Sequence, residues 1–244
     1  MKNNYLVTGC GKGIGRSIIK NLLENTNSNV VGIYRSDVEE MNNLKKYNDR
    51  LILLKGNSSN EDLLLKALEK SKLIFNCFPN KYVVNAGIRC RELLEEVNDK
   101  QLDDLWEINY FALRNLLKVL IKNNKINNIA LVYISSIVSK LGFENLDDYG
   151  ATKAASESLI RSISIRFPES RFNIVSPGFT KSSYANDFRK NLPELYDWTI
   201  KRTPATRWGE CFEISKAVLF LLDDDSSFIR GQVLHIDGGW SINA

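Results

Sequence analysis

Short apolar runs alternate along this chain with longer stretches in which apolar positions recur at helical spacing. The runs are rich in Val, Ile, Leu and Tyr and hold few polar positions, a pattern typical of strands covered on both faces. We expect strands at Tyr5–Thr8, Val30–Tyr34, Leu51–Lys55, Tyr82–Asn85, Asn128–Ile134, Phe172–Ser176 and Gln232–Ile236.

The intervening stretches predict helices, because their apolar residues fall on one helical face. Residues 71–81 fit two interpretations, since Leu73–Phe75 could end a helix or form a short strand. Alternating strands and helices predict an α/β fold, with a doubly wound, mostly seven-stranded parallel sheet and helices on both faces. The expected helices lie near Ile14–Glu24, Asp37–Tyr47, Glu61–Lys70, Lys100–Asn123, Asp147–Phe167 and Glu213–Leu222.

Length and charge narrow the classes of protein to consider. The 244 residues suffice for one α/β domain, and we find no repeat or linker, so we expect a single domain over residues 1–244. The net charge of +4 is small and its cations alternate with acids, so neither nucleic acid nor an anionic membrane is an expected partner. No apolar run approaches the ~18 residues of a membrane span.

The cysteines and the single histidine limit the chemistry further. Cys10, Cys77, Cys90 and Cys211 are far apart and form no Cys-x-x-Cys motif, so we expect reduced thiols in a cytoplasmic protein. The chain enters its first strand at once, so we expect no signal peptide. With His235 alone, neither a histidine-based triad nor a zinc site is expected, and we assign no metal ligands.

A glycine-rich turn follows the first strand and opens the first helix. It reads Thr8-Gly9-Cys10-Gly11-Lys12-Gly13-Ile14-Gly15. Glycines permit a tight turn there and let backbone N–H groups approach a pyrophosphate at the helix N-terminus. The spacing departs from G-x-G-x-x-G and fits T-G-x-x-x-G-x-G, with Gly11 as an additional glycine. Because a strand precedes the turn and a helix follows it, we favour a nucleotide site over a turn without a ligand.

The end of the second strand should contact the ribose of such a nucleotide. A site for NAD places an acid there, but this chain has Tyr34, Arg35 and Ser36. A guanidinium binds phosphate in a bidentate manner, and Lys12 could reach the same group. Asp37 lies beyond the strand and is expected to cap the next helix. We therefore favour NADP(H), with NAD(H) as the alternative, although Arg35 and Lys12 could also be solvated surface cations.

Tyr149 and Lys153 are four residues apart in a predicted helix and therefore share a face. An ammonium beside a phenol favours the phenolate, so Lys153 is expected to lower the pKa of Tyr149 from its usual ~10. Such a phenol can exchange a proton with a carbonyl or an alcohol, and Ser136 can offer a hydroxyl to the same oxygen. By itself this spacing arises by chance on the order of once per chain. It gains meaning only from the other motifs.

Together these features resemble the short-chain dehydrogenase/reductase family over essentially the whole chain, most of all its 3-oxoacyl-[acyl-carrier-protein] reductase group. The resemblance implies a Rossmann fold with Asn109, Ser136, Tyr149 and Lys153 as catalytic residues. Its further motifs are Asn85-Ala86-Gly87 after a strand, Pro177-Gly178 beside the nicotinamide, and a last strand over Gly231–Gly239.

Two positions depart from the family pattern. Where the family has an Asp for the adenine amino group, this chain has Asn57 followed by Ser58, and the amide oxygen of Asn57 can still accept that hydrogen bond. After Pro177-Gly178, Thr180 and Ser182 compete for the contact with the nicotinamide carboxamide.

The family resemblance implies reversible hydride transfer between NADP(H) and a ketone/secondary-alcohol pair. Tyr149 would act as the general acid or base while Ser136 holds the substrate oxygen. Lys153 would also bond the nicotinamide ribose, and Asn109 would hold a water that links Lys153 to solvent.

The residues expected around the substrate allow two interpretations. A lid is expected over Phe179–Pro204, and Arg89 and Arg91 follow the Asn-Ala-Gly motif. These cations would suit an anionic substrate, such as a 3-oxoacyl thioester on a carrier, or they could be solvated. A sugar or another small polar ketone is the alternative.

Two other functions compete with a ketone reductase. The first is a catalytically idle dinucleotide-binding sensor or structural subunit, which would have no physical need of a lysine beneath the tyrosine. The second is a nucleotide-sugar epimerase or dehydratase, for which the residues after Gly178 leave little room. By analogy with the family, we expect a homodimer or homotetramer built on the two long helices.

Overall fold

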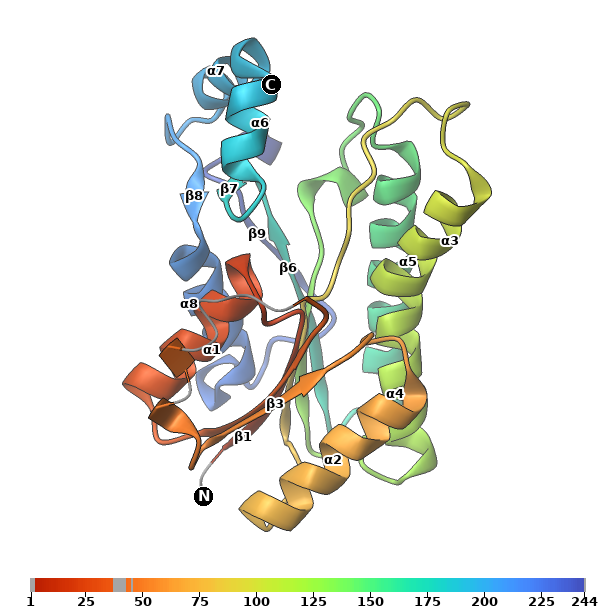
Figure 1. Cartoon of the computed structure of the whole chain (residues 1–244), viewed down its shortest axis with the longest axis vertical. Helices are drawn as coiled ribbons and strands as arrows, with labels where there is room; N and C mark the ends of the chain where they lie inside the picture. Colours follow the sequence, from red (N-terminus) through yellow and green to blue (C-terminus); the bar gives the residue numbers. More distant parts are fainter. Residues whose placement is uncertain (1–2, 37–42, 45, 244) are drawn as a thin grey trace.

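A single parallel sheet of seven strands forms the centre of the molecule (Figure 1). The computed structural model describes residues 3–36, 43–44 and 46–243. The strand order is β3-β2-β1-β4-β5-β6-β9, so the doubly wound parallel sheet predicted from sequence is confirmed. The strands are β1 (Asn4–Thr8), β2 (Asn29–Tyr34), β3 (Leu51–Lys55), β4 (Lys81–Val84), β5 (Ala130–Ile134), β6 (Arg171–Pro177) and β9 (Val233–Ile236).

Helices cover both faces of this sheet. One face packs against α1 (Gly13–Asn25) and α8 (Cys211–Leu222), and the other packs against α2 (Glu61–Phe75), α4 (Ala112–Lys122) and α5 (Asp147–Arg166). Two further helices lie above the carboxyl ends of the strands, at the top of Figure 1. These are α6 (Ala185–Asn191) and α7 (Pro193–Arg202).

Alternate side chains of each strand enter opposite cores, as the pleat requires. In β1, Leu6 packs with the α2/α4/α5 layer, whereas Tyr5 and Val7 pack with the α1/α8 layer. All three side chains are buried, which explains why the strands read as continuous apolar runs. No helix in the described ranges has the length and apolar character that crossing a membrane requires.

The long helix expected over Lys100–Asn123 is interrupted. The structure has α3 (Asp99–Trp106), then a π-helical turn at Glu107–Phe111, then α4. One extra residue in this turn shifts the side chains after it, and such turns often occur at functional sites. Helical periodicity cannot reveal it, because the polypeptide stays helical on both sides.

Other differences from the sequence predictions are local. Leu73–Phe75 ends α2, which resolves the ambiguity at residues 71–81. The helix predicted over Asp37–Tyr47 lies mostly on residues 37–42 and 45, outside the described residues. An additional small parallel sheet pairs β7 (Thr180–Lys181) with β8 (Gly209–Glu210), two strands too short for a sequence signal.

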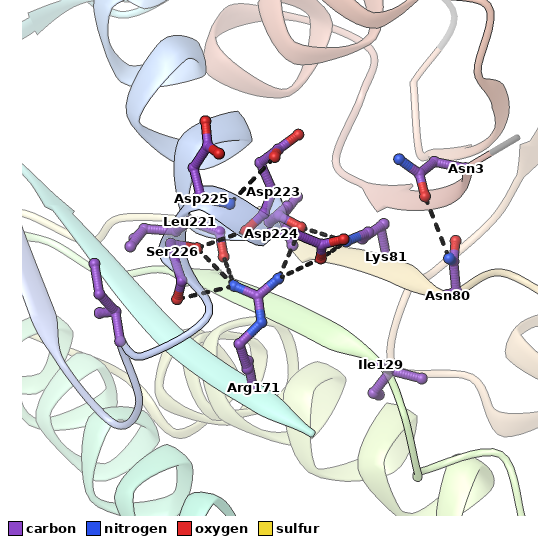
Figure 2. A network of polar contacts seen from close by, with 12 residues as sticks. Asn3, Asn80, Lys81, Ile129, Arg171, Leu221, Asp223, Asp224, Asp225 and Ser226 are labelled. Carbon is purple, nitrogen blue, oxygen red and sulfur yellow. Dashed lines mark hydrogen bonds and ion pairs between the residues drawn. The ribbon is translucent and has the colours of Figure 1, made fainter. Parts of the chain in front are cut away.

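Two buried cations tie α8 to the amino-terminal edge of the sheet (Figure 2). Arg171, at the start of β6, donates to the carbonyl oxygens of Leu221 and Leu222 at 3.1 and 3.2 Å and to Ser226 Oγ at 2.6 Å. Lys81, at the start of β4, donates to the same Leu222 carbonyl at 2.5 Å. These bonds satisfy the orphan carbonyls at the helix end, where the macrodipole favours positive charge.

We predict that Arg171→Met lowers the free energy of unfolding by about 2–4 kcal/mol, because it leaves buried carbonyl groups without donors. Asp224→Asn is the matched control, since that carboxylate lies 3.5 Å from Arg171 Nη2 but is 95% exposed. Urea denaturation followed by circular dichroism measures both variants. Equal transition midpoints for the two would contradict a structural role for the Arg171 contacts.

Candidate active site

A cleft of about 590 Å³ opens at the carboxyl ends of the strands. At this edge the chain leaves β1 and β4 toward opposite faces of the sheet, and a crevice forms there between their loops. The cleft is lined by most of the predicted site residues, namely Gly9, Gly11, Lys12, Gly13, Ile14, Tyr34, Arg35, Ser36, Asn57, Ser58, Asn85, Ala86, Gly87, Ser136, Tyr149, Lys153, Pro177, Gly178, Thr180 and Ser182.

The glycine turn approaches its neighbours too closely for side chains. Gly9 and Gly13 have φ of +66° and +57°, in the left-handed region. A Cβ on Gly15 would lie 2.3 Å from the carbonyl oxygen of Gly9, so this glycine packs α1 against the turn behind the cleft. The N-terminus of α1 is open: Lys12, its N-cap residue, makes no side-chain cap, and the first turn holds no acid.

Thr8 and Asn85 hold the glycine turn against the end of β4. Thr8 Oγ1 accepts hydrogen bonds from the backbone N–H groups of Asn85 and Ala86 at 3.1 and 3.2 Å. Asn85 Nδ2 donates to the carbonyl oxygen of Gly9 at 2.9 Å. Thr8 and Gly15 therefore hold the glycine turn in place without lining the cleft themselves. Asn85 holds the turn and also lines the cleft.

Exposed cations face the cleft at the end of β2. Arg35, Ser36 and Lys12 are all exposed, and neither cation forms an ion pair within the described ranges. Asp37, the expected cap of the next helix, lies outside the described residues.

Asn57 is held by its own neighbours. Its side-chain oxygen accepts from the Ser59 N–H at 3.1 Å, and its amide donates to Glu107 at 2.7 Å. Ser58 beside it is buried at the cleft wall. The amide oxygen of Asn57 keeps one lone pair for a ligand, since a carbonyl oxygen has two.

Tyr149, Ser136 and Lys153 converge on one part of the cleft. Ser136 follows β5 and occupies the N-cap position of a short 3-10 turn (Ile137–Ser139). A hydrogen bond between its side chain and Tyr149 lowers the pKa of Tyr149. Lys153 lies one turn further along α5, with Nζ 5.8 Å from the centre of the Tyr149 ring. Its ammonium donates to the carbonyl oxygen of Ile134 at 2.9 Å. The arrangement places the hydroxyl groups of Ser136 and Tyr149 where both could bond to one oxygen of a ligand.

The expectation that Lys153 lowers the pKa of Tyr149 is wrong. Burial raises the pKa of Tyr149 above its ordinary value, and the cation that opposes this rise is Arg89. Burial also lowers the pKa of Lys153 to about 7, although the charge of Glu157 raises it. Both groups therefore shift toward their neutral forms, because removal from water penalises the ammonium and the phenolate alike.

Asn109 lies in the π-helical turn and is buried behind the cleft. Its side chain pairs with the backbone of Ile88, accepting from N–H at 2.9 Å and donating to the carbonyl at 3.0 Å. It also donates to Thr152 Oγ1 at 3.1 Å, on α5. Asn109 thus joins the loop after β4 to the helix that carries Tyr149, and its predicted role in holding a water stays a prediction.

The segment after β6 closes the cleft from above. Gly178 allows a close approach, since a Cβ there would lie 2.7 Å from the Cβ of Asp237. Thr180 Oγ1 donates to the carbonyl oxygen of Gly178 at 3.1 Å and is buried. Ser182 faces the glycine turn instead, with its Cβ 3.3 Å from a Cβ built on Gly13. The two hydroxyls that competed for one contact therefore address different parts of the cleft.

Glu157 is a site residue that sequence reasoning missed. Its Oε1 accepts from Ser135 Oγ and Ser139 Oγ, both at 2.6 Å, and so holds the loop that presents Ser136 from both sides. The carboxylate is buried one turn beyond Lys153. The available signal was the i, i+4 spacing of the two residues, which places a potential acceptor on the same face.

These residues fit a dinucleotide. The open N-terminus of α1 offers backbone N–H groups and a positive dipole to a pyrophosphate. Gly87 leaves room beside the polar atoms of the site, since a Cβ there would lie 3.3 Å from Lys153 Nζ. Among the described residues, no three His, Cys, Asp or Glu side chains are grouped as metal ligands would be.

Comparison with known proteins defines the class to which this fold and site belong. Residues 9–241 match the family model described as "Enoyl-(Acyl carrier protein) reductase". The chain belongs to the short-chain dehydrogenase/reductase family and is an oxidoreductase.

Individual relatives point to several substrates. A chloroplastic tropinone reductase homolog of Arabidopsis thaliana is 30% identical, with 98% of this chain and 75% of that protein covered. The 3-oxoacyl-[acyl-carrier-protein] reductase of Escherichia coli is 29% identical over 96% and 95% of the two chains. The solved structure "ElxO with NADP Bound" is 27% identical with a TM-score of 0.88, over 99% of this chain and 100% of that one.

We predict that Glu157→Gln lowers kcat/KM roughly tenfold and shifts its pH profile. The amide can still accept from both serines, but it removes the charge that raises the pKa of Lys153, and one pKa unit corresponds to a factor of ~10. Ser162→Ala, an exposed change on the same helix, is the control. A reduced rate with an unchanged pH profile would mean that Glu157 acts only in folding.

Proposed function

We propose that this protein reduces a ketone to a secondary alcohol with NADPH, or catalyses the reverse reaction, with Tyr149 as the proton donor or acceptor. The observation that carries the proposal is one cleft in which Tyr149, Ser136 and Lys153 face an open helix N-terminus. The family membership supports the same chemistry.

In this proposal each residue has a separate task. A bound nicotinamide supplies or takes the hydride. Tyr149 donates its phenolic proton to the carbonyl oxygen, while Ser136 holds that oxygen as negative charge grows on it. Lys153 lies beneath the tyrosine, where it can bond the nicotinamide ribose. The raised pKa of Tyr149 keeps the phenol protonated at neutral pH, which suits an acid in the direction of reduction.

We predict that Tyr149→Phe abolishes turnover while NADPH still binds, as checked by absorbance loss and by fluorescence titration. In the wild type, the raised pKa keeps the phenol of Tyr149 protonated from neutral to mildly alkaline pH, so any change in the rate of ketone reduction over this range should follow Lys153, whose pKa is about 7, and not Tyr149. Alcohol oxidation should rise over the same range, since it needs the phenolate. Unchanged turnover in Tyr149→Phe would refute the assignment.

We also propose NADP(H) rather than NAD(H) as the preferred cofactor. The support is the pair of exposed cations, Arg35 and Lys12, at the cleft wall where an acid would favour NAD. The similar structure ElxO, which has NADP bound, agrees with this preference.

We predict that Arg35→Ala weakens NADPH binding roughly 10- to 100-fold, the effect of losing one or two charge-assisted hydrogen bonds to a phosphate. NADH, which lacks the 2′-phosphate, is the internal control and should bind the variant as it binds the wild type. Fluorescence titration with both nucleotides measures the difference. An equal loss for the two would show that Arg35 does not read the phosphate.

For the substrate we propose a 3-oxoacyl thioester or, as the alternative, a sugar or another small polar ketone. The thioester is supported by the likeness to the 3-oxoacyl-[acyl-carrier-protein] reductases. The alternative is supported by the gluconate 5-dehydrogenase of Gluconobacter oxydans, which is 33% identical over 65% of this chain and 63% of that protein. A panel of both classes, run with NADPH and the Tyr149→Phe control, separates them.

We also propose that the chain is one cytoplasmic domain in which residues 179–204 act as the substrate lid. An idle sensor is disfavoured, because the full set of Ser136, Tyr149 and Lys153 faces the cleft.

We further propose a homodimer or homotetramer, supported by Phe111, an apolar side chain 40% exposed beside the α4/α5 face. Sedimentation of the pure chain as a monomer would contradict that assembly.

A further inference from the structure

Two arginines occupy the wall of the cleft between the loop after β4 and the lid. Arg89 stacks on the ring of Tyr184, with its guanidinium carbon 4.2 Å from the ring centre. Arg91 lies over Phe188 at 5.9 Å. Both arginines and Tyr184 line the cleft that holds Tyr149, whereas Phe188 belongs to the lid helix α6.

No carboxylate within the described ranges neutralises either guanidinium by an ion pair. The nearest acid along the chain, Glu92, is engaged by the side-chain amide of Gln101 at 2.8 and 2.9 Å. The charge of Glu144 acts on Arg91 only from a distance. Two like charges in one cleft repel each other, and here partial burial, together with the charge of Arg89, lowers the pKa of Arg91. An anion between the two arginines would relieve this repulsion.

The position of Arg89 limits where that anion can lie. Arg89 lines the same cleft as Tyr149, and its charge opposes the rise that burial causes in the pKa of both Tyr149 and Tyr184. Apolar residues, among them Ile137 and Phe143, line the cleft as well. A carboxylate a few bonds from the carbonyl would place both groups of the substrate in this one cleft. The phosphate of a phosphopantetheine arm fits it poorly, because the whole arm separates that phosphate from the thioester.

We infer that Arg89 and Arg91 form a subsite for a carboxylate carried by the ketone substrate, so that the preferred substrates are short oxo acids. This inference rests on the proposed function, and of the two substrate classes named there it favours the small polar ketone over the 3-oxoacyl thioester. A guanidinium presents paired donors to a carboxylate, and the Arg89 guanidinium is held over the ring of Tyr184. The subsite then places the ketone with its oxygen toward Ser136 and Tyr149.

Matched substrate pairs test the subsite. Short 2-oxo and 3-oxo acids are compared with their methyl esters, using NADPH and the wild-type chain. We expect the acids to have the higher kcat/KM, and Arg89→Gln or Arg91→Gln to reduce the acid-to-ester ratio of kcat/KM roughly 10- to 100-fold, mainly through KM. Arg89→Lys should restore part of the ratio. Arg189→Gln, an exposed change on the lid outside the cleft wall, should leave the ratio as it is.

Three results would overturn the inference. The first is an equal loss for acid and ester in the arginine variants, and the second is a preference for the esters. The third is a loss of kcat/KM in the arginine variants that occurs with acetoacetyl-coenzyme A but not with the short N-acetylcysteamine thioester. That result would assign the arginines to binding a phosphate instead.

A binding measurement separates failure of the subsite from failure of the proposed function. Calorimetric titration of the NADPH-bound Tyr149→Phe chain with a short hydroxy acid does not depend on turnover. Binding that Arg89→Gln weakens at least tenfold supports the subsite even if the wild type reduces no ketone, an outcome that would refute the proposed function alone. Binding unaffected by Arg89→Gln would refute the subsite.

Discussion

The parallel sheet imposes the constraint on which the whole site depends. Because all seven strands run the same way, their carboxyl ends meet at one edge, and every loop that leaves them starts there. The connection after β1 goes to the α1/α8 face and the connection after β4 goes to the other face, so the two loops part between these strands. The glycine turn, the motif after β4 and the catalytic helix are brought together by this topology.

The two edges of the sheet differ in how the helix ends beside them are capped. At the amino-terminal edge, Arg171 and Lys81 satisfy the end of α8, and the edge is closed by hydrogen bonds (Figure 2). At the carboxyl edge, the N-terminus of α1 has no side-chain cap. The unsatisfied N–H groups there are what an anionic ligand needs, so the uncapped helix end favours binding over stability.

Burial shifts the pKa values of Tyr149 and Lys153 more strongly than these two residues shift each other's pKa. Tyr149 and Lys153 both shift toward neutrality, because each lies where water is largely excluded. The groups that oppose these shifts come from outside the pair: Arg89 acts on the phenol and Glu157 on the amine. The pKa values of these two residues therefore depend on at least two more, which reach them from other turns of the chain.

The sequence by itself determined the class of fold, and it predicted a set of catalytic residues that stays a prediction. Largely apolar runs place the seven strands to within a few residues, since burial on both faces favours apolar side chains. The glycine turn and the spacing of Ser136, Tyr149 and Lys153 are local, so they could be predicted. Only the tertiary structure decided the π-helical turn at Asn109, the contact of Glu157 with two serines, and the direction of the pKa shifts. These depend on which distant side chains exclude water from one another, and that exclusion exists only once the helices have packed on the sheet.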